Sequence, residues 1–197
     1  MLYVLIGASS YAVLALGELA SAKRLPNLGR LLTGVGSVEL LGALVQLLRT
    51  SQRVVVSLYV AIPFYVLSAF WFFLLVYSLF VEIPLRAAYL DASKGLVPVT
   101  TGTYALSRHP GVLWWGLFLL SLFVATGRVW LAAAALLWSL ANAGYSGIQE
   151  RLNYRTRFGE NYPLYVQYAE SVPMVLPTPK TVKRCAQTVF RSSGESA

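Results

Sequence analysis

The sequence contains few charged residues. Only 12% of its 197 residues are charged, whereas 57% are hydrophobic. An ordinary soluble domain is about 25% charged and about 45–50% apolar. This balance excludes a soluble globular enzyme and a disordered chain. A helical membrane span needs roughly 20 apolar residues, so the length allows about five spans with their loops. We therefore expect an all-α integral membrane protein.

Residues that bind metals or form disulfides are also scarce. The chain has one cysteine, Cys185, and one histidine, His109. A single cysteine excludes an intrachain disulfide, a secreted disulfide scaffold and a thiolate cluster. We expect no metal site.

The positive charge of the chain lies outside its apolar runs. The formal net charge is +8. Basic residues in loops set the orientation of a membrane protein and contact anionic headgroups. No compact basic stripe is interleaved with aromatic residues, so nucleic acid is not an expected partner.

Five apolar segments divide the chain. They cover residues 2–20, 31–48, 54–81, 111–127 and 129–148. The last two are almost contiguous, which predicts a tight helical hairpin. The loop over residues 82–110 is too long to be a mere connector. We expect one membrane domain over residues 1–180 and a basic, flexible tail over residues 181–197.

The basic residues predict the orientation. With five spans, thirteen of them fall on one side and only Arg49, Arg53 and Arg128 on the other. Positively charged loops stay in the cytoplasm. The long loop and the C-terminal segment are therefore expected to face the cytoplasm, from the cell membrane of a prokaryote.

Two carboxylates lie within the apolar segments. Glu18 is near the end of the first segment and Glu39 is inside the second. Charges in lipid are costly and usually face the interior of the helix bundle. Each is either part of a proton or substrate path, or a structural residue that is protonated or hydrogen-bonded.

The richest polar cluster precedes the fourth apolar segment. It contains Gly102, Tyr104, Arg108, His109 and Pro110. Proline suits the first turn of a helix. The unpaired N–H groups of a helix start, beside basic side chains, favour an anion such as a carboxylate or a phosphate. The other interpretation is an arginine that sets topology and a histidine that caps the helix.

A second cluster follows the fifth apolar segment. Glu150 lies where the helix is expected to leave the membrane, and aromatic residues follow it. Glu150 either forms an ion pair with Arg108 or Arg151, or accepts hydrogen bonds from a hydroxyl or ammonium group of a ligand.

The two clusters together form one pattern. It reads Gly-x-Tyr-x-x-x-Arg-His-Pro, an apolar hairpin, a Glu, Phe-Gly-x-x-Tyr-x-x-Tyr and Val-Pro. It is carried by Gly102, Tyr104, Arg108, His109, Pro110, Glu150, Phe158, Gly159, Tyr162, Tyr165, Val172 and Pro173. The pattern resembles the isoprenylcysteine carboxyl methyltransferase and phospholipid methyltransferase superfamily, over residues 96–173.

The resemblance implies an integral membrane methyltransferase that uses S-adenosylmethionine. It implies a cytoplasmic cofactor-binding segment and a lipophilic or amphipathic acceptor, such as a membrane lipid, that enters from the bilayer between helices. The implied cofactor-binding residues are Leu96, Val97, Pro98, Val99, Gly102, Tyr104, Arg108, His109, Pro110 and Glu150.

The acceptor is less defined than the cofactor. Ser146 occupies the position of the arginine that orients a prenylcysteine carboxylate in the family, so such a carboxylate is not expected. An amine or thiol acceptor must lose a proton. Glu39 and Tyr145 are candidate catalytic residues for that step.

Two other interpretations stay open. A non-catalytic relative would bind a lipid, a haem-pathway or quinone-like molecule, or a partner. It is suggested by Val112 and Arg151, where the family commonly has an aromatic and an acidic residue. A reductase on the related fold, like the sterol reductases, would bind the 2′-phosphate of NADPH through Arg151, Arg155 and Arg157.

Overall fold

The structure is a computed structural model that describes residues 1–83 and 96–188. The helices are α1 (Leu2–Ala22), α2 (Pro26–Thr50), α3 (Leu58–Phe80), η2 (Gly102–Ala105), α5 (Pro110–Thr126), α6 (Val129–Phe158), η3 (Gly159–Asn161), α7 (Tyr162–Ser171) and α8 (Pro179–Thr188). Within the two described ranges no strand forms, apart from one antiparallel bridge between Arg53 and Arg128. The expected all-α fold is confirmed at this level.

Four helices in the described ranges are long and apolar enough to cross a membrane. Two of them are α1 and α2. The other two are the helical segment Leu58–Glu82, which begins with α3, and the helical segment Val129–Ser171, which begins with α6. The fifth expected span corresponds to α5, which is apolar but has only 17 residues. Helices are the expected form of such segments, because lipid cannot satisfy backbone polar groups. These helices indicate a membrane protein.

The start of α3 differs from the sequence prediction. The expected third span began at residue 54, but α3 begins at Leu58. The intervening backbone pairs with the turn between α5 and α6. The Val54 amide donates to the Gly127 carbonyl at 2.9 Å, and the Val129 amide donates to the Gln52 carbonyl at 3.1 Å. These bonds compete with helix formation, and an apolar run alone does not reveal them.

α6 is longer than its apolar run. The sequence predicted a span over residues 129–148. The structure has one continuous helix of 30 residues. At 1.5 Å per residue it measures about 45 Å, longer than the roughly 30 Å hydrocarbon core. Its polar last turns therefore extend the helix beyond the expected span.

The described chain forms two compact units. Unit 1 contains residues 1–72 and 114–153, and unit 2 contains the remaining residues, 73–113 and 154–197. The sequence predicted a single domain over residues 1–180. Helices α3, α5 and α6 each contribute residues to both units.

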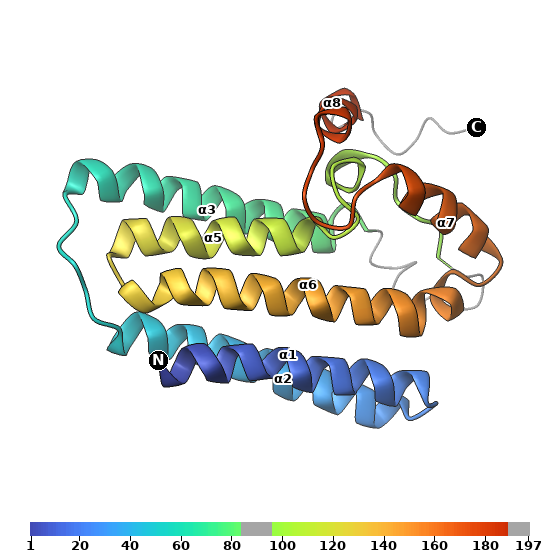
Figure 1. Ribbon diagram of the computed structural model, residues 1–197, viewed down its shortest axis with the longest axis horizontal. Helices are drawn as coiled ribbons and strands as arrows, with labels where there is room; N and C mark the ends of the chain where they lie inside the picture. Colours follow the sequence, from blue (N-terminus) through green and yellow to red (C-terminus); the bar gives the residue numbers. More distant parts are fainter. Residues whose placement is uncertain (84–95, 189–197) are drawn as a thin grey trace. The chain divides into compact units, whose positions relative to one another are not determined.

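Unit 1 is built on close helix packing. α1 and α2 form a hairpin and lie side by side (Figure 1). Trp138 of α6 is fully buried, and its indole N–H donates to the Val4 carbonyl of α1 at 2.8 Å. Gly7 leaves the space for this ring, since a Cβ there would lie 2.1 Å from Trp138 Cζ2.

We expect Gly7→Ala to destabilise the protein by about 1–3 kcal/mol, because an added methyl group in a packed site forces side chains or backbone to shift. Gly42→Ala is the matched control, since nothing lies within 4 Å of a Cβ at that position of α2. The control should be neutral or slightly stabilising, because alanine favours helices. The measurement is the thermal unfolding midpoint of both variants in detergent. Equal unfolding midpoints for Gly7→Ala and Gly42→Ala would contradict the close packing of Trp138 against Gly7.

Unit 2 contains a small aromatic core. Phe158, Tyr165, Tyr168 and Val172 are buried together. The rings of Phe158 and Tyr165 stack at 4.7 Å between centroids. α7 supplies Tyr165 and Tyr168 of this core. α8 covers residues that the sequence assigned in part to a flexible tail, while residues 189–197 of that tail lie outside the described residues.

Candidate functional site

Hydrogen bonds in unit 2 join the two halves of the sequence pattern. The Arg108 amide donates to the Pro173 carbonyl at 3.0 Å, and the His109 amide donates to the Met174 carbonyl at 3.0 Å. The Ser107 hydroxyl also donates to the Met174 carbonyl, at 2.8 Å. The Arg-His-Pro segment and the Val-Pro segment, far apart in sequence, are therefore one structural element.

Two predicted site residues also hold the scaffold together. The Tyr104 hydroxyl donates to the Ser78 carbonyl at the end of α3, at 3.2 Å. The Tyr168 hydroxyl donates to the Tyr104 carbonyl at 2.7 Å. The Arg108 guanidinium donates to the Ala169 carbonyl at 3.0 Å. Tyr104 and Arg108 thus connect the end of α3 and the η2 segment to α7.

His109 and Pro110 lie where this element meets α5. The His109 ring is half-buried, with its centroid 6.1 Å from that of Tyr154. Pro110 is buried at the first position of α5, as its sequence context predicted. Its fixed φ suits that position, where a missing N–H does no harm. The aromatic ring of Tyr154 packs edge-on against Tyr165 at 5.0 Å, which connects His109 to the aromatic core.

The segment over residues 96–99 is irregular backbone beside this core. The Leu96 amide donates to the Arg157 carbonyl at the end of α6, at 2.9 Å. Leu96 packs on the aromatic core, whereas Val97 is exposed and Pro98 and Val99 are half-buried. Backbone of this kind can present N–H and C=O groups to a ligand, which the interior of a helix does not.

Gly102 occupies a position that favours glycine. Its φ is +59°, and a Cβ would lie 2.0 Å from Glu82 Oε1. The Gly102 amide donates to Thr188 Oγ1 of α8 at 3.1 Å. Glu82 accepts hydrogen bonds from the Thr103 amide, at 2.8 Å, and from the Thr103 hydroxyl. Glu82 therefore holds the start of η2 in place.

The sequence did not reveal this role of Glu82. It lies at the end of an apolar segment, and the sequence places it only at the start of the long loop. Glu82 also affects Cys185 of α8: burial raises the pKa of the Cys185 thiol, and the negative charge of Glu82 raises it further. We conclude that Cys185 is a protonated thiol at neutral pH and a weak nucleophile.

Nine of the ten predicted cofactor-binding residues belong to unit 2. Glu150 belongs to unit 1, where it is half-buried on α6. Within unit 2 the structure brings the segment over residues 102–110 together with α7, and the segment over residues 96–99 together with the end of α6.

Glu18 is the centre of a polar network in unit 1. It is buried, with 6% of its surface exposed. Its Oε1 accepts hydrogen bonds from the Tyr145 hydroxyl at 3.0 Å and from Gln149 Nε2 at 2.6 Å. Asn153 Nδ2 donates to Oε2. The three donors are spaced by four residues on α6, which places them on one face of that helix. The hydrogen-bonded interpretation of Glu18 is therefore the one the structure matches.

The two candidate catalytic residues make separate contacts. Glu39 is half-buried on α2, and its Oε1 accepts a hydrogen bond from the Ser9 hydroxyl at 3.0 Å. Tyr145 contacts Glu18 and Gln149 instead. The carboxylate that Tyr145 contacts is therefore that of Glu18, whereas Glu39 contacts Ser9.

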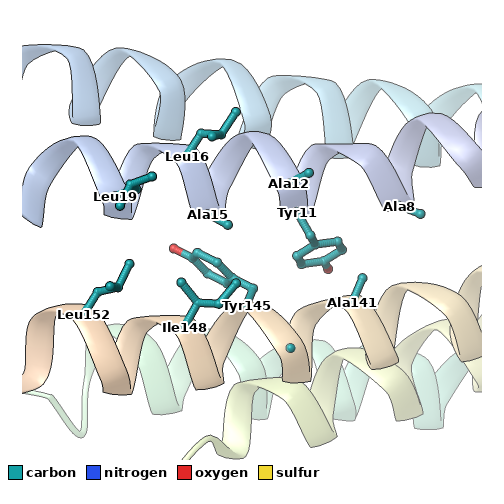
Figure 2. Close-up of a pocket in the computed structure, with 11 residues that line it drawn as sticks. Ala8, Tyr11, Ala12, Ala15, Leu16, Leu19, Ala141, Tyr145, Ile148 and Leu152 are labelled. Carbon is teal, nitrogen blue, oxygen red and sulfur yellow. The ribbon is translucent and has the colours of Figure 1, made fainter.

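A cavity of about 610 Å³ lies between α1 and α6, within unit 1. We call it the α1–α6 groove. Figure 2 shows the rings of Tyr11 and Tyr145 between the two helices, and their centroids are 6.4 Å apart. The other residues that line the α1–α6 groove are aliphatic or glycine: Ala8, Ala12, Ala15, Leu16, Leu19, Ala141, Gly144, Ile148 and Leu152. Ligand pockets typically have volumes of about 300–1,000 Å³.

Metal-binding clusters are absent from residues 1–83 and 96–188. No group of three or more His, Cys, Asp or Glu side chains that could hold an ion occurs there.

One family matches the part of the chain that carries most of the sequence pattern. Residues 88–172 match a family described as "Protein of unknown function (DUF1295)". The family is also known as a steroid 5-alpha reductase-like membrane family. The match does not single out the isoprenylcysteine methyltransferase superfamily. No curated protein and no solved structure shows significant similarity to the chain.

Proposed function

We propose that the protein is an integral membrane methyltransferase that uses S-adenosylmethionine and acts on a lipophilic or amphipathic acceptor. The pairing of the Arg108 and His109 amides with the Pro173 and Met174 carbonyls carries this proposal. This pairing supports the proposal because it joins the two halves of the sequence pattern that resembles the methyltransferase superfamily. The family match over residues 88–172 includes Arg108 and His109 and ends just before Pro173.

The chemistry of the donor set fits the cofactor. S-adenosylmethionine carries a carboxylate, an ammonium group, ribose hydroxyls and a purine. The Arg108 guanidinium suits the carboxylate. Glu150 suits the ammonium or hydroxyl groups, and Tyr104 with the backbone of residues 96–99 suits the adenosine. The bound cofactor would supply an electrophilic methyl group. The protein would hold the acceptor in line with it and exclude water.

The α1–α6 groove supports a lipophilic acceptor. Its walls are mostly alanine, leucine and isoleucine side chains, which suit an apolar chain. Tyr145 lines the groove and bonds to the buried Glu18. An acceptor amine or thiol must lose a proton when it is methylated. The candidates for accepting this proton are Tyr145, which lines the groove, and Glu39 of α2.

We propose five spans, with α5 as the fourth in chain order. Its 17 residues extend about 25 Å, which lies at the short end of the range for a span. This arrangement would place the long loop and the C-terminal segment in the cytoplasm, because it collects thirteen basic residues on that side. A prokaryotic cell membrane is the proposed location.

A second candidate function is an NADPH-dependent reductase. The matched family is known as reductase-like, and this name favours the reductase function. Arg155 and Arg157 are exposed on the last turns of α6, where they could contact a 2′-phosphate. A non-catalytic lipid-binding protein would use the α1–α6 groove alone.

Titration calorimetry on the purified full chain separates these functions. We expect S-adenosylmethionine and S-adenosylhomocysteine to bind with micromolar Kd. His109→Ala and Glu150→Ala should each weaken binding by about 1–3 kcal/mol, or roughly 5- to 150-fold. Glu170→Ala, which removes an exposed carboxylate at the end of α7, is the matched control and should bind normally. Binding of NADPH alone would favour the reductase. If folded protein in nanodiscs bound neither S-adenosylmethionine nor NADPH, only the lipid-binding function would be left.

A further inference from the structure

α8 has one buried face and one basic face. Thr181, Cys185 and Thr188 lie at helical spacing and are buried or half-buried, and α8 packs against η2 (Figure 1). Lys180 and Lys183 are exposed on the other side of the helix. α8 contains no acidic residue. The helix is therefore a short amphipathic segment whose outer face is cationic.

Both ends of α8 are fixed by hydrogen bonds. At its start, the Thr178 amide donates to Thr181 Oγ1 at 2.9 Å, and the Thr181 amide donates to Thr178 Oγ1 at 3.3 Å. At its end, Thr188 Oγ1 accepts from the Gly102 amide. A helix of ten residues is marginal by itself in water. The order of α8 therefore depends on what packs on it, and it is linked directly to the Gly102 turn.

This link places α8 near the end of a membrane-spanning segment. The apolar helical segment that begins with α3 extends to Glu82. Glu82 accepts from the Thr103 amide, and the neighbouring Gly102 amide donates to Thr188. Two adjacent residues therefore connect the end of α8 to the end of a span. Leu176 and Val182 expose apolar side chains, as residues at a lipid boundary do.

We propose that α8 is an interfacial helix that binds anionic lipid headgroups through Lys180 and Lys183, and that it thereby stabilises the Gly102 turn. An anionic membrane surface attracts cationic side chains close to a span, and salt screens this attraction. Because the Gly102 amide bonds to Thr188, a lipid that orders α8 also orders the turn. The inference concerns the membrane surface and does not depend on any cofactor.

Hydrogen exchange of the full chain in nanodiscs tests this proposal. We compare nanodiscs of phosphatidylcholine with nanodiscs in which part of it is replaced by phosphatidylglycerol. Amides of residues 180–188 and 101–105 should exchange on the order of tenfold more slowly with the anionic lipid, and high salt should abolish the difference. Equal exchange in both lipids would overturn the proposal.

Variants separate headgroup binding from the link to the turn. Lys180→Gln with Lys183→Gln should remove the lipid dependence of both segments. Lys23→Gln with Arg30→Gln, which removes two exposed cations elsewhere, should preserve it. Thr188→Val should remove the lipid dependence of residues 101–105 only. A lipid effect that persists without Lys180 and Lys183 would overturn headgroup binding, and one that persists at the turn without the Thr188 hydroxyl would overturn the link.

Discussion

Replacing Glu18 with alanine is expected to lower the free energy of unfolding by about 2–4 kcal/mol. Single hydrogen bonds between membrane helices contribute only about 0.6 kcal/mol on average. Glu18, however, accepts from three side chains of α6, and it is itself buried. Its removal leaves several donors of Tyr145, Gln149 and Asn153 to find new acceptors away from water, and unsatisfied buried donors are costly.

Two further variants make this expectation specific. Glu18→Gln keeps an acceptor oxygen but turns an N–H₂ group toward the same donors, so its effect should be intermediate. Glu39→Ala is the control, because Glu39 is half-buried and bonds to Ser9. Its effect should stay below about 1 kcal/mol. The measurement is denaturant unfolding in detergent, followed by tryptophan fluorescence. If Glu18→Ala and Glu39→Ala behaved alike, Glu18 would not be the centre of a network.

The Glu18 network shows what the sequence could predict of the fold. Apolar runs located the long helices, because lipid leaves the backbone no partner outside the helix. The spacing of Tyr145, Gln149 and Asn153 also marks one polar face of α6. Nothing in the sequence indicates that this face meets Glu18, because that contact depends on how α1 and α6 pack. The late start of α3 was hidden for the same reason, since its cause is pairing with the Gly127 turn.

The candidate site was predictable to a similar extent. The pattern linked the Arg108–His109 segment to the Val172–Pro173 segment, and the structure joins them through backbone hydrogen bonds. The partners of Tyr104 and Arg108 are backbone carbonyls, which every residue offers, so the sequence carries no signal for them. The sequence does not predict α8, because its ten mostly polar residues have no apolar periodicity long enough to indicate a helix.

Gly102→Ala is expected to destabilise unit 2 by about 2–4 kcal/mol and to disturb the proposed cofactor site. A residue with a Cβ at a φ of +59° costs roughly 1–2 kcal/mol. The new methyl group would also lie 2.0 Å from Glu82 Oε1, so the carboxylate must move away from Thr103. Glycine at this position thus allows the carboxylate of Glu82 to approach the backbone of the turn.

A double-mutant cycle separates the two causes. Glu82→Ala alone loses the hydrogen bonds to Thr103, and Gly102→Ala alone suffers both the backbone strain and the clash. In the double variant the clash is absent, so its destabilisation should be smaller than the sum of the two single effects by about 1 kcal/mol or more. The cycle is measured by denaturant unfolding in detergent, with Gly42→Ala as the control for adding a methyl group in open space. Additive effects would mean that Glu82 does not contact the turn at Gly102, and that strain at φ alone requires the glycine.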